Sequence, residues 1–460
     1  MRQIIKKLVD GIMAKLWDKG IKLNESVEEY TVGIDYILDN ELVPYDVAGS
    51  IAHAKMLAKI GVLTEKEYVK LEKELEGINT LHKKGKFKIF KSNEDVHTAI
   101  ENHLVEKLGD TGKKIHTARS RNDQVLVDMR LYMKDKLIDV MEAAITLAET
   151  LTSFANENKD VPIVGRTHTQ KAMPSSVGLL AASFAESLLD DLKLLSCAFE
   201  LVDQNPLGSG AAYGSEIPVD RELTAKLLGF SKVQNNVLYC ANSRGKVEAA
   251  VLSACSQVML DLSRIASDII FWSIPETGYF TLQDELFLGS SLMPQKKNPC
   301  ALELVRANTS IVQGYQSQVY GIVAGLISGY NRDVQLTKEP LMRGLSVTKA
   351  SVDVVNLTVK KLNVNKKKCF EGFTPEVFAT DEALRLVAQG IPFRNAYKQV
   401  AKNMGKLKNE DPVKNIKGKK IAGATGNLGL ARIKSELKKT LSFIKLEKKR
   451  NRRVLAELID

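Results

Sequence analysis

The stretch that decides the fold class is Met133-Lys-Asp-Lys-Leu-Ile-Asp-Val-Met-Glu-Ala-Ala-Ile-Thr-Leu-Ala-Glu-Thr-Leu-Thr-Ser-Phe154. Its apolar residues recur in strict steps of four and three, at Met133, Leu137, Val140, Ala144, Leu147, Leu151 and Phe154. This spacing predicts a helix of about six turns with a single apolar stripe. Because a repeat near 3.5 residues favours a shallow crossing angle between long helices, we expect a helical bundle.

The same stepping returns three times later in the chain. The later runs are Leu188, Leu192, Leu195, Phe199 and Val202, then Val251, Cys255, Val258, Leu262, Ile265, Ile269 and Trp272, and finally Val352, Val355, Val359 and Leu362. Strand signals are sparse, so the sequence predicts an all-α protein with a long central helical bundle. Further apolar residues beside the main stripe, such as Leu260, Ile270 and Phe271, indicate a contact between subunits of a homo-oligomer.

Shorter helical segments precede and follow the predicted bundle, and polar loops separate them from it. We therefore predict three parts. An N-terminal helical domain covers residues 1–105, and the central long-helix bundle covers residues 106–362. A C-terminal helical domain with a basic tail covers residues 363–460.

The composition is ordinary for a soluble globular protein, with 460 residues of which 44% are hydrophobic. No apolar run approaches the roughly 18 residues of a membrane span. Met1 to Trp17 looks like a short amphipathic helix rather than a secretory signal. The five cysteines are scattered without a C-x-x-C pair, which gives no disulfide framework and no zinc site. We expect a reducing cytoplasmic compartment and no membrane partner.

The net charge of +11 comes from the C-terminal tail, since residues 401–460 hold 17 Lys or Arg and 6 Asp or Glu. A basic tail can attract anionic partners. It lacks interleaved aromatic residues and any RNA-binding signature, so we expect a solvated face and no nucleic-acid partner.

The run Gly289-Ser-Ser-Leu-Met-Pro-Gln-Lys-Lys-Asn-Pro299 places hydroxyl, ammonium and amide groups in one loop, and Glu303 follows at once. Glycine and proline fix the turn, while lysine and asparagine can bind a carboxylate. By composition alone, the loop could equally be a polar surface loop. Its chemistry favours a reaction at a carboxylate.

Two further segments carry candidate functional groups. Gly165 to Pro174 lies in a break between helices and contains Thr167 and His168, a natural proton carrier when neighbouring polar groups fix its tautomer. Thr117 to Val125 carries Arg121 and Asn122 just before a helix, where an arginine fork can bind a carboxylate. The structural alternative for the second segment is a capped helix start.

Other segments suggest ligands that their spacing does not support. His97, Glu101 and His103 could be taken for a metal site, but they do not form H-E-x-x-H and no third ligand has suitable spacing. The glycine-rich runs 207–214 and 422–429 lack a preceding strand and a G-K-[ST] sequence. We therefore expect no metal and no nucleotide.

Taken in order along nearly the whole chain, these segments resemble the fumarase, aspartase and argininosuccinate lyase superfamily. The Gly289 loop is similar to G-S-S-x-M-P-x-K-x-N-P, and the His168 segment to T-H-x-Q-x-A-x-P. The Thr117 to Val125 string is similar to the one that separates argininosuccinate lyases from their siblings. This family has also given rise to lens δ-crystallins.

The resemblance implies a fumarase-like helical fold and a carbon–nitrogen lyase. Its reaction would be the reversible cleavage of argininosuccinate to arginine and fumarate, the last step of arginine biosynthesis, without a metal or organic cofactor. The family assembles as cytoplasmic homotetramers whose active sites combine segments from different subunits. A sibling lyase acting on aspartate, malate or adenylosuccinate, and a structural crystallin, are the competing interpretations.

The resemblance also assigns roles to individual residues. Ser290 would be the base, and Lys296 and Asn298 would hold the carboxylate that accumulates charge. His168, beside Thr167 and backed by Glu303, would act as the acid or orient a water that does. The substrate would be bound by His97, Arg121, Asn122, Arg244, Tyr330, Gln335 and Lys338.

The chain departs from the family pattern in its N-terminal part. The usual W-G-G-R-F is Trp17-Asp-Lys-Gly-Ile21, and a serine that relatives place near the substrate is Gly33. The segment from Asn236 to Arg244 keeps only its ends. Substrate contacts from the N-terminal region therefore differ from the family pattern.

Overall fold

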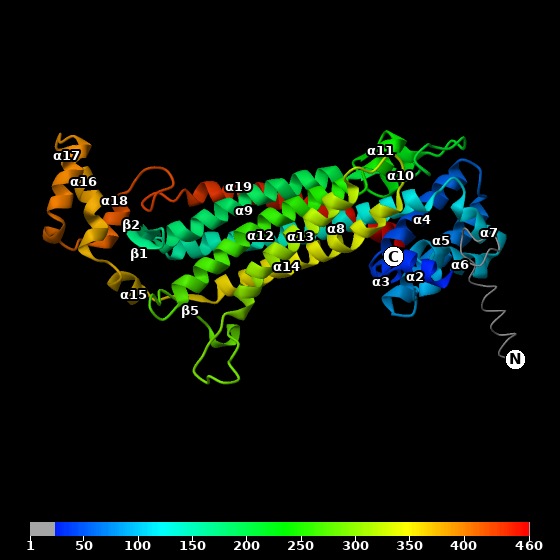
Figure 1. Ribbon diagram of the computed structural model, residues 1–460. Coiled ribbons are helices and arrows are strands. Elements are labelled where there is room, and N and C mark those ends of the chain that lie inside the picture. The colour runs from blue at the N-terminus through cyan, green and yellow to red at the C-terminus, as the bar shows by residue number, and fades with distance from the viewer. Residues whose placement is uncertain (1–23, 460) are drawn as a thin grey trace.

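The computed structural model describes residues 24–459 and shows an elongated protein built on long helices (Figure 1). The expected amphipathic helix at Met1 to Trp17 and the Trp17 to Ile21 departure lie outside the described residues. Five long helices form the centre: α8 (Arg121–Glu157), α9 (Val177–Val202), α12 (Lys246–Ser273), α13 (Cys300–Val323) and α14 (Lys338–Lys360). The predicted all-α bundle is confirmed.

The first bundle helix begins earlier than the apolar stripe indicated. α8 has 37 residues and starts at Arg121, where the Ser120 side chain accepts a hydrogen bond from the backbone of Asn122 and Asp123 bonds back to Ser120. This capping box satisfies backbone groups that the start of a helix leaves open. Arg121 and Asn122 therefore lie in the first turn of α8, whereas the sequence placed them just before the helix. The prediction was wrong because the polar residues of the first turn do not continue the apolar repeat.

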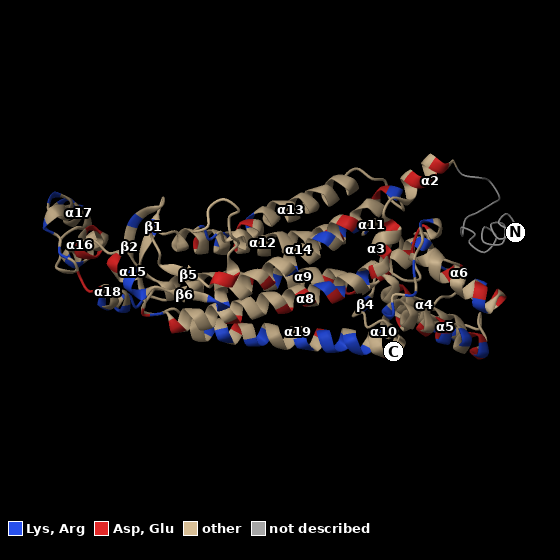
Figure 2. Cartoon of the chain, turned by 90° about the horizontal axis from the view of Figure 1, so that it is seen from below, with Lys and Arg blue, Asp and Glu red and all other residues tan. Residues whose placement is uncertain are grey.

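Two long helices carry no clear signal in the apolar stepping. α13 packs between α12 and α14, but its outer side exposes Leu304, Ile311 and Tyr320, so its apolar residues do not form one stripe. The basic C-terminal segment forms α19 (Leu430–Ile459), which returns along α8 and α9. Figure 2 shows lysines and arginines spread along the length of α19 at the edge of the bundle.

The apolar composition of α12 is explained by its place in the core of the bundle. α12 is long and apolar enough to cross a membrane by length and composition, but 61% of its most apolar window is buried inside the protein. Val251, Leu252, Val258, Leu262 and Ala266 are all fully or almost fully buried. The apolar character of α12 is that of a core helix among other helices.

Short elements cover the end of the bundle nearest the start of the described chain (Figure 1). They are α2 (Glu25–Val32), α3 (Asp35–Leu38), η1 (Asp39–Glu41), α4 (Val43–Lys59), α5 (Glu65–Lys83), η2 (Lys91–Asn93), α6 (Val96–Leu108), α7 (Asp110–Lys113) and η3 (Lys114–His116). At the same end lie β3 (Gln204–Asn205), α10 (Arg221–Leu227), β4 (Lys232–Val233), α11 (Val237–Asn242) and η5 (Arg332–Thr337). β3 and β4 pair in parallel.

The opposite end carries an antiparallel hairpin, β1 (Pro162–Thr167) with β2 (Gln170–Ser176). A second antiparallel pair joins β5 (Phe280–Leu282) to β6 (Leu362–Val364), and η4 (Asp284–Leu286) follows β5. Beyond them lie α15 (Lys366–Glu371), η6 (Pro375–Phe378), α16 (Ala379–Ala388), α17 (Phe393–Lys402), η7 (Met404–Lys406) and α18 (Pro412–Gly418). The division near residues 105 and 363 stays a prediction, and α19 returns to the bundle after the second boundary.

Candidate active site

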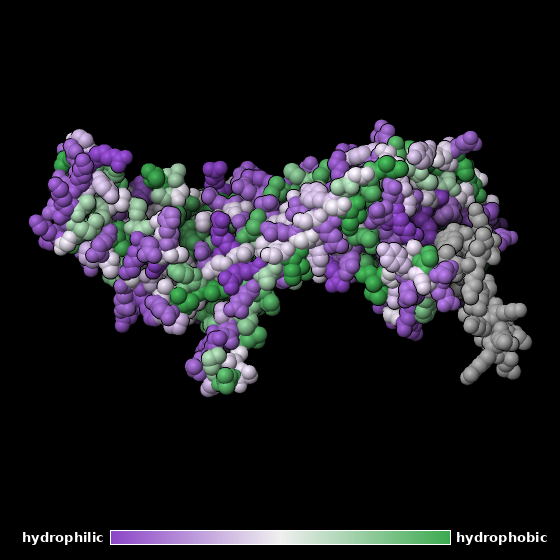
Figure 3. Space-filling model, viewed as in Figure 1, coloured by the Kyte–Doolittle hydropathy of each residue, from purple (hydrophilic) through white to green (hydrophobic). Residues whose placement is uncertain are grey.

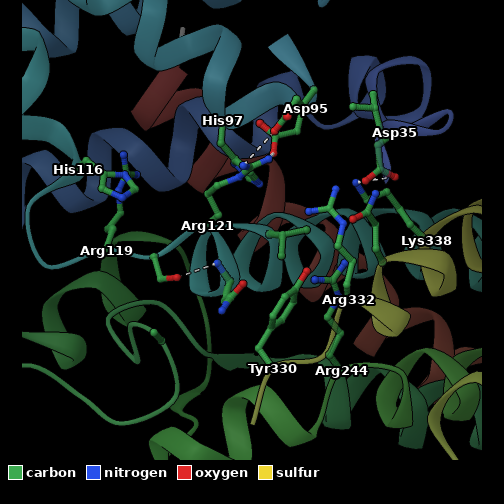
Figure 4. Close-up of a pocket in the computed structure, with 17 residues that line it drawn as sticks. Asp35, Asp95, His97, His116, Arg119, Arg121, Arg244, Tyr330, Arg332 and Lys338 are labelled. Atoms are coloured by element: carbon green, nitrogen blue, oxygen red, sulfur yellow. Dashed lines mark hydrogen bonds and ion pairs between the residues drawn. The ribbon is translucent and has the colours of Figure 1, made fainter. Parts of the chain in front are cut away.

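A cavity of about 520 Å³ opens at the end of the bundle formed by the N-terminal helices (Figure 4). Segments far apart in sequence meet there: α2 and α3, the start of α6, the start of α8, and the segment leading into η5 and α14. Its lining residues are Val32, Asp35, Glu94, Asp95, His97, His116, Arg119, Ser120, Arg121, Asn122, Val125, Ala211, Arg244, Tyr330, Arg332, Gln335 and Lys338. All seven residues predicted to bind substrate are among them.

The cavity is rich in cations that are held in place by acids. Arg121 donates to Glu94 at 3.2 Å and also bonds to Asp95. Burial opposes the charge of Arg121, yet these two carboxylates raise its pKa. Arg244 is 7% exposed and makes no salt bridge within the described part of the chain. An unneutralised guanidinium in a cavity can bind a carboxylate in a bidentate way.

Lys338 is the most buried cation of the cavity. Its Nζ lies 2.5 Å from Asp39 Oδ1 and 3.4 Å from Asp35 Oδ1. Burial alone would lower the pKa of Lys338, but the charges of Asp39 and Asp35 outweigh burial and raise it. Lys338 therefore stays charged at the wall of the cavity.

The predicted acid lies elsewhere, at the tip of the β1–β2 hairpin. His168 and Thr169 form its two-residue turn, and both have positive φ, 51° and 62°. This conformation strains a residue that is not glycine, especially a β-branched one, and such strain marks candidate functional positions. Arg166 braces the turn by donating to the Thr169 carbonyl at 2.7 Å, while Thr167 and His168 are exposed.

The Gly289 loop follows β5 and projects sideways from the bundle (Figure 1), where it forms the protruding lobe of the space-filling view in the same orientation (Figure 3). Mutual backbone hydrogen bonds of 3.0 Å between Leu288 and Asn298 close its base. Ser290 Oγ accepts hydrogen bonds from two backbone amides, Leu292 at 3.3 Å and Met293 at 3.0 Å. Lys296 is exposed, so its ammonium group can reach a ligand outside the loop.

Within one chain, the predicted catalytic residues do not line the cavity. Glu303 lies exposed in the first turn of α13, and no hydrogen bond or ion pair joins it to His168 within residues 24–459. The hairpin and the cavity lie at opposite ends of the molecule (Figure 1). The structure thus gathers the seven binding residues and leaves Ser290, Lys296, Asn298 and Glu303 in a second region, with Thr167 and His168 in a third.

Sequence reasoning missed several residues that line the cavity. Arg119 and Arg332 belong to segments already singled out, so their proximity to predicted binding residues was the available signal. Asp35 and His116 lie in short N-terminal elements without a distinctive pattern, and nothing in the sequence marked them.

In the described chain, potential metal ligands come within 4.8 Å of one another at Asp46, His97 and Asp128. This set differs from the one considered from sequence. His103 instead lies 2.8 Å from Glu74. His97 Nδ1 is bonded directly to Asp46, and the charge of Arg119 acts on the same carboxylate. A direct hydrogen bond and a neighbouring guanidinium fit a proton network better than a divalent cation.

The chain is similar to known lyases along most of its length. A lyase family model matches residues 19–314. The argininosuccinate lyase of Thermotoga neapolitana is 47% identical over 394 residues, covering 86% of this chain and 99% of that protein. The argininosuccinate lyase of Sorangium cellulosum is 43% identical over 416 residues, covering 90% of this chain and 96% of that protein.

Solved structures share the fold at low identity. An EDDS lyase in complex with formate has a TM-score of 0.81 at 22% identity and covers 96% of each chain. A class II fumarase from Schistosoma mansoni has a TM-score of 0.69 at 16% identity, covering 84% of this chain and 94% of that one. At these identities the likeness concerns the fold, which is the fumarase-like bundle that the sequence predicted.

Proposed function

The chain belongs to the argininosuccinate lyase family of the fumarase and aspartase superfamily, and from this premise we propose that it cleaves argininosuccinate reversibly to arginine and fumarate. The observation that carries the proposal is the cavity of Figure 4, where all seven residues predicted to bind this substrate come together. The reaction uses no metal or organic cofactor. It serves as the last step of arginine biosynthesis in the cytoplasm.

The charges of the cavity suit a substrate with carboxylates at both ends. Arg121, Arg244 and Lys338 supply cations for these carboxylates. Glu94 and Asp95 supply negative charge for the cationic groups of the arginine part, and they also orient Arg121. Asn122 and Tyr330 add neutral hydrogen-bonding groups.

The chemical step begins with removal of a proton from the carbon beside a carboxylate. We assign this step to Ser290, whose hydroxyl must lose its own proton to act as a base. The two backbone amides that donate to Ser290 Oγ support the assignment, because they would stabilise an alkoxide. Lys296 and Asn298 then hold the dianionic aci-carboxylate that forms.

The carbon–nitrogen bond breaks as the aci-carboxylate collapses to fumarate, and its electron pair goes to the departing guanidinium nitrogen. His168 protonates that nitrogen or orients a water that does so, with Glu303 behind it. The strained, exposed turn that presents His168 supports a role outside its own subunit.

A complete site therefore requires more than one chain. We propose a homotetramer in which the cavity, the hairpin and the Gly289 loop of different subunits meet. Apolar side chains exposed on the bundle face support it: Leu260 is 44% exposed on α12, and Leu304 is 63% exposed on α13. Burying such a face against another bundle is the usual basis of a stable oligomer.

Fumarate release tests the proposed function directly. Purified protein is mixed with argininosuccinate, malate, aspartate or adenylosuccinate, and fumarate is followed by its ultraviolet absorbance. We expect fumarate only from argininosuccinate. Release from one of the other three substrates would identify a sibling lyase, and no release from any of them would favour a structural protein.

A further inference from the structure

A buried cluster of two carboxylates and one imidazole lies directly behind the substrate cavity. His97 lines the cavity, and its Nδ1 lies 2.5 Å from Asp46 Oδ2 and 3.6 Å from Asp128 Oδ2. The three side chains are each at most 3% exposed. Within the described chain His97 Nε2 makes no hydrogen bond, so this nitrogen is available to the cavity.

Close helix packing creates the cluster. Asp46 is on α4, His97 on α6 and Asp128 on α8. Gly49, one turn after Asp46, allows α4 to approach α8, because a Cβ at this position would lie 3.3 Å from Val127 Cγ1 and 3.7 Å from Asp128 Oδ1. A larger residue at position 49 would push the two carboxylates apart.

The two carboxyls have opposite proton preferences. Burial raises the pKa of Asp128 well above its ordinary value, and the charges of Asp46 and Asp39 add to this effect. Burial also disfavours a charged Asp46, but the hydrogen bond and charge of His97, together with Arg119, lower the pKa of Asp46.

The remaining neighbours complete the environment of Asp46. Ser50 Oγ donates to Asp46 Oδ1 at 3.1 Å, and Arg119 Nη1 donates to the same hydroxyl at 3.0 Å. Asp46 therefore accepts from both an imidazole and a hydroxyl. Ligand atoms of Asp46, His97 and Asp128 lie within 4.8 Å of one another, and Asp128 Oδ2 has no hydrogen-bond partner in the described chain. This arrangement suits one ionised and one protonated carboxyl.

We infer that Asp46 is a positioning residue that accepts Nδ1–H of His97 and so directs His97 Nε2 at a substrate group in the cavity, while Asp128 closes another side of the imidazole. The inference deepens the proposed function and rests on it. A histidine oriented by a buried carboxylate is fixed in both ring position and proton arrangement. His97 is thereby held in one ring orientation at the wall of the cavity.

Three variants of the full-length protein test the inference in the fumarate-release assay. Asp46→Asn removes the carboxylate that holds the Nδ1 side of His97, and we expect KM to rise at least about tenfold while kcat changes less than about threefold. Asp128→Asn preserves the shape and a donor of a protonated carboxyl, so KM should rise less than about threefold. Asp191→Asn changes an equally buried carboxyl in the distant bundle core and should leave KM unaltered.

A double-mutant cycle separates positioning from general destabilisation. If Asp46 acts through His97, then Asp46→Asn should change KM less than about threefold in a protein that already carries His97→Gln. Circular dichroism confirms that each variant is folded. Should Asp46→Asn fail to fold, Ser50→Ala removes the hydroxyl that orients Asp46 and should raise KM about threefold without lowering kcat.

Several outcomes would overturn the inference. They are an unchanged KM in folded Asp46→Asn or in Ser50→Ala, a loss in Asp128→Asn as large as that in Asp46→Asn, and a full Asp46→Asn effect in the His97→Gln background. A wild-type protein that releases no fumarate from argininosuccinate would instead refute the proposed function. An active wild type with an unaffected Asp46→Asn variant refutes only the positioning role.

Discussion

Mixing two inactive variants tests the division of the active site among subunits. Ser290→Ala removes the proposed base in the Gly289 loop, and His168→Asn removes the proposed acid in the hairpin. Neither side chain belongs to the hydrophobic core, and His168 is exposed, so both variants should fold and assemble. Each alone should lose activity by at least about 100-fold, because each lacks a group that transfers a proton.

The positions of the Gly289 loop and the β1–β2 hairpin predict how active a mixture of the two variants should be. The loop projects sideways from the bundle, whereas the hairpin lies at one end of the bundle (Figure 1). We therefore expect a complete site to take them from two different subunits. In randomly mixed tetramers, a site has an intact Ser290 with a probability of one half and an intact His168 with a probability of one half. About one quarter of the sites should therefore be fully competent.

Co-expression of the two variants with different affinity tags isolates the mixed tetramers, and their fumarate release is compared with that of wild type. Activity near one quarter of the wild-type value supports the shared site. Activity no greater than that of the separate variants would refute the reasoning, since it would mean that one subunit supplies both groups. The pair Arg121→Met with Ser290→Ala applies the same logic to the cavity and the loop.

Three further predictions concern single positions. Ser290→Ala should bind argininosuccinate with a Kd within about threefold of wild type in calorimetry, because the binding residues lie in a separate region, and much weaker binding would contradict this. Burial and the neighbouring Asp261 raise the pKa of Asp191 from 3.8 to about 8, so wild-type stability should fall from pH 4 to pH 8 and stay flat above it. Asp191→Asn should remove this slope in urea unfolding, and an unchanged slope would exclude Asp191 as its source. Thr169→Gly should raise the thermal midpoint through about 1 kcal/mol of relieved strain, whereas a lower midpoint would show that the turn is not strained.

The apolar periodicity predicted the fold because most of the central helices bury one face. It underestimated the length of α8. The first turn of that helix holds Asp123, which takes part in the cap, and Arg121 and Asn122, which belong to the proposed substrate site. It missed α13, whose apolar residues are divided between the core and an exposed face. A repeat detects a helix only when burial, and not function or assembly, selects most of its residues.

Local sequence could not predict the β1–β2 hairpin. Two-residue turns of this kind normally carry Asn-Gly or a similar pair, because both positions need positive φ. Here the turn is His168-Thr169, and the β-branched Thr169 is unusual at a positive φ. The local rule fails at a position where a proton-carrying side chain has to be presented, and such failures are expected at functional sites.

The predicted substrate-binding residues and the proposed catalytic residues are placed differently within one chain. Substrate-binding residues must converge on one volume, and the N-terminal helices, α8 and the segment leading into α14 bring them there within a single subunit. The proposed base and acid would have to approach that volume from outside. Each lies on a locally braced element, Ser290 by its two amides and His168 by Arg166. A bundle of near-parallel long helices supplies the required geometry, because antiparallel stacking of two bundles places the middle or far end of one subunit against the near end of another.

In the proposed tetramer, the helical faces that bury Leu260 and Leu304 would therefore also align the catalytic groups. Mutations that weaken this apolar contact should lower kcat before they unfold the subunit.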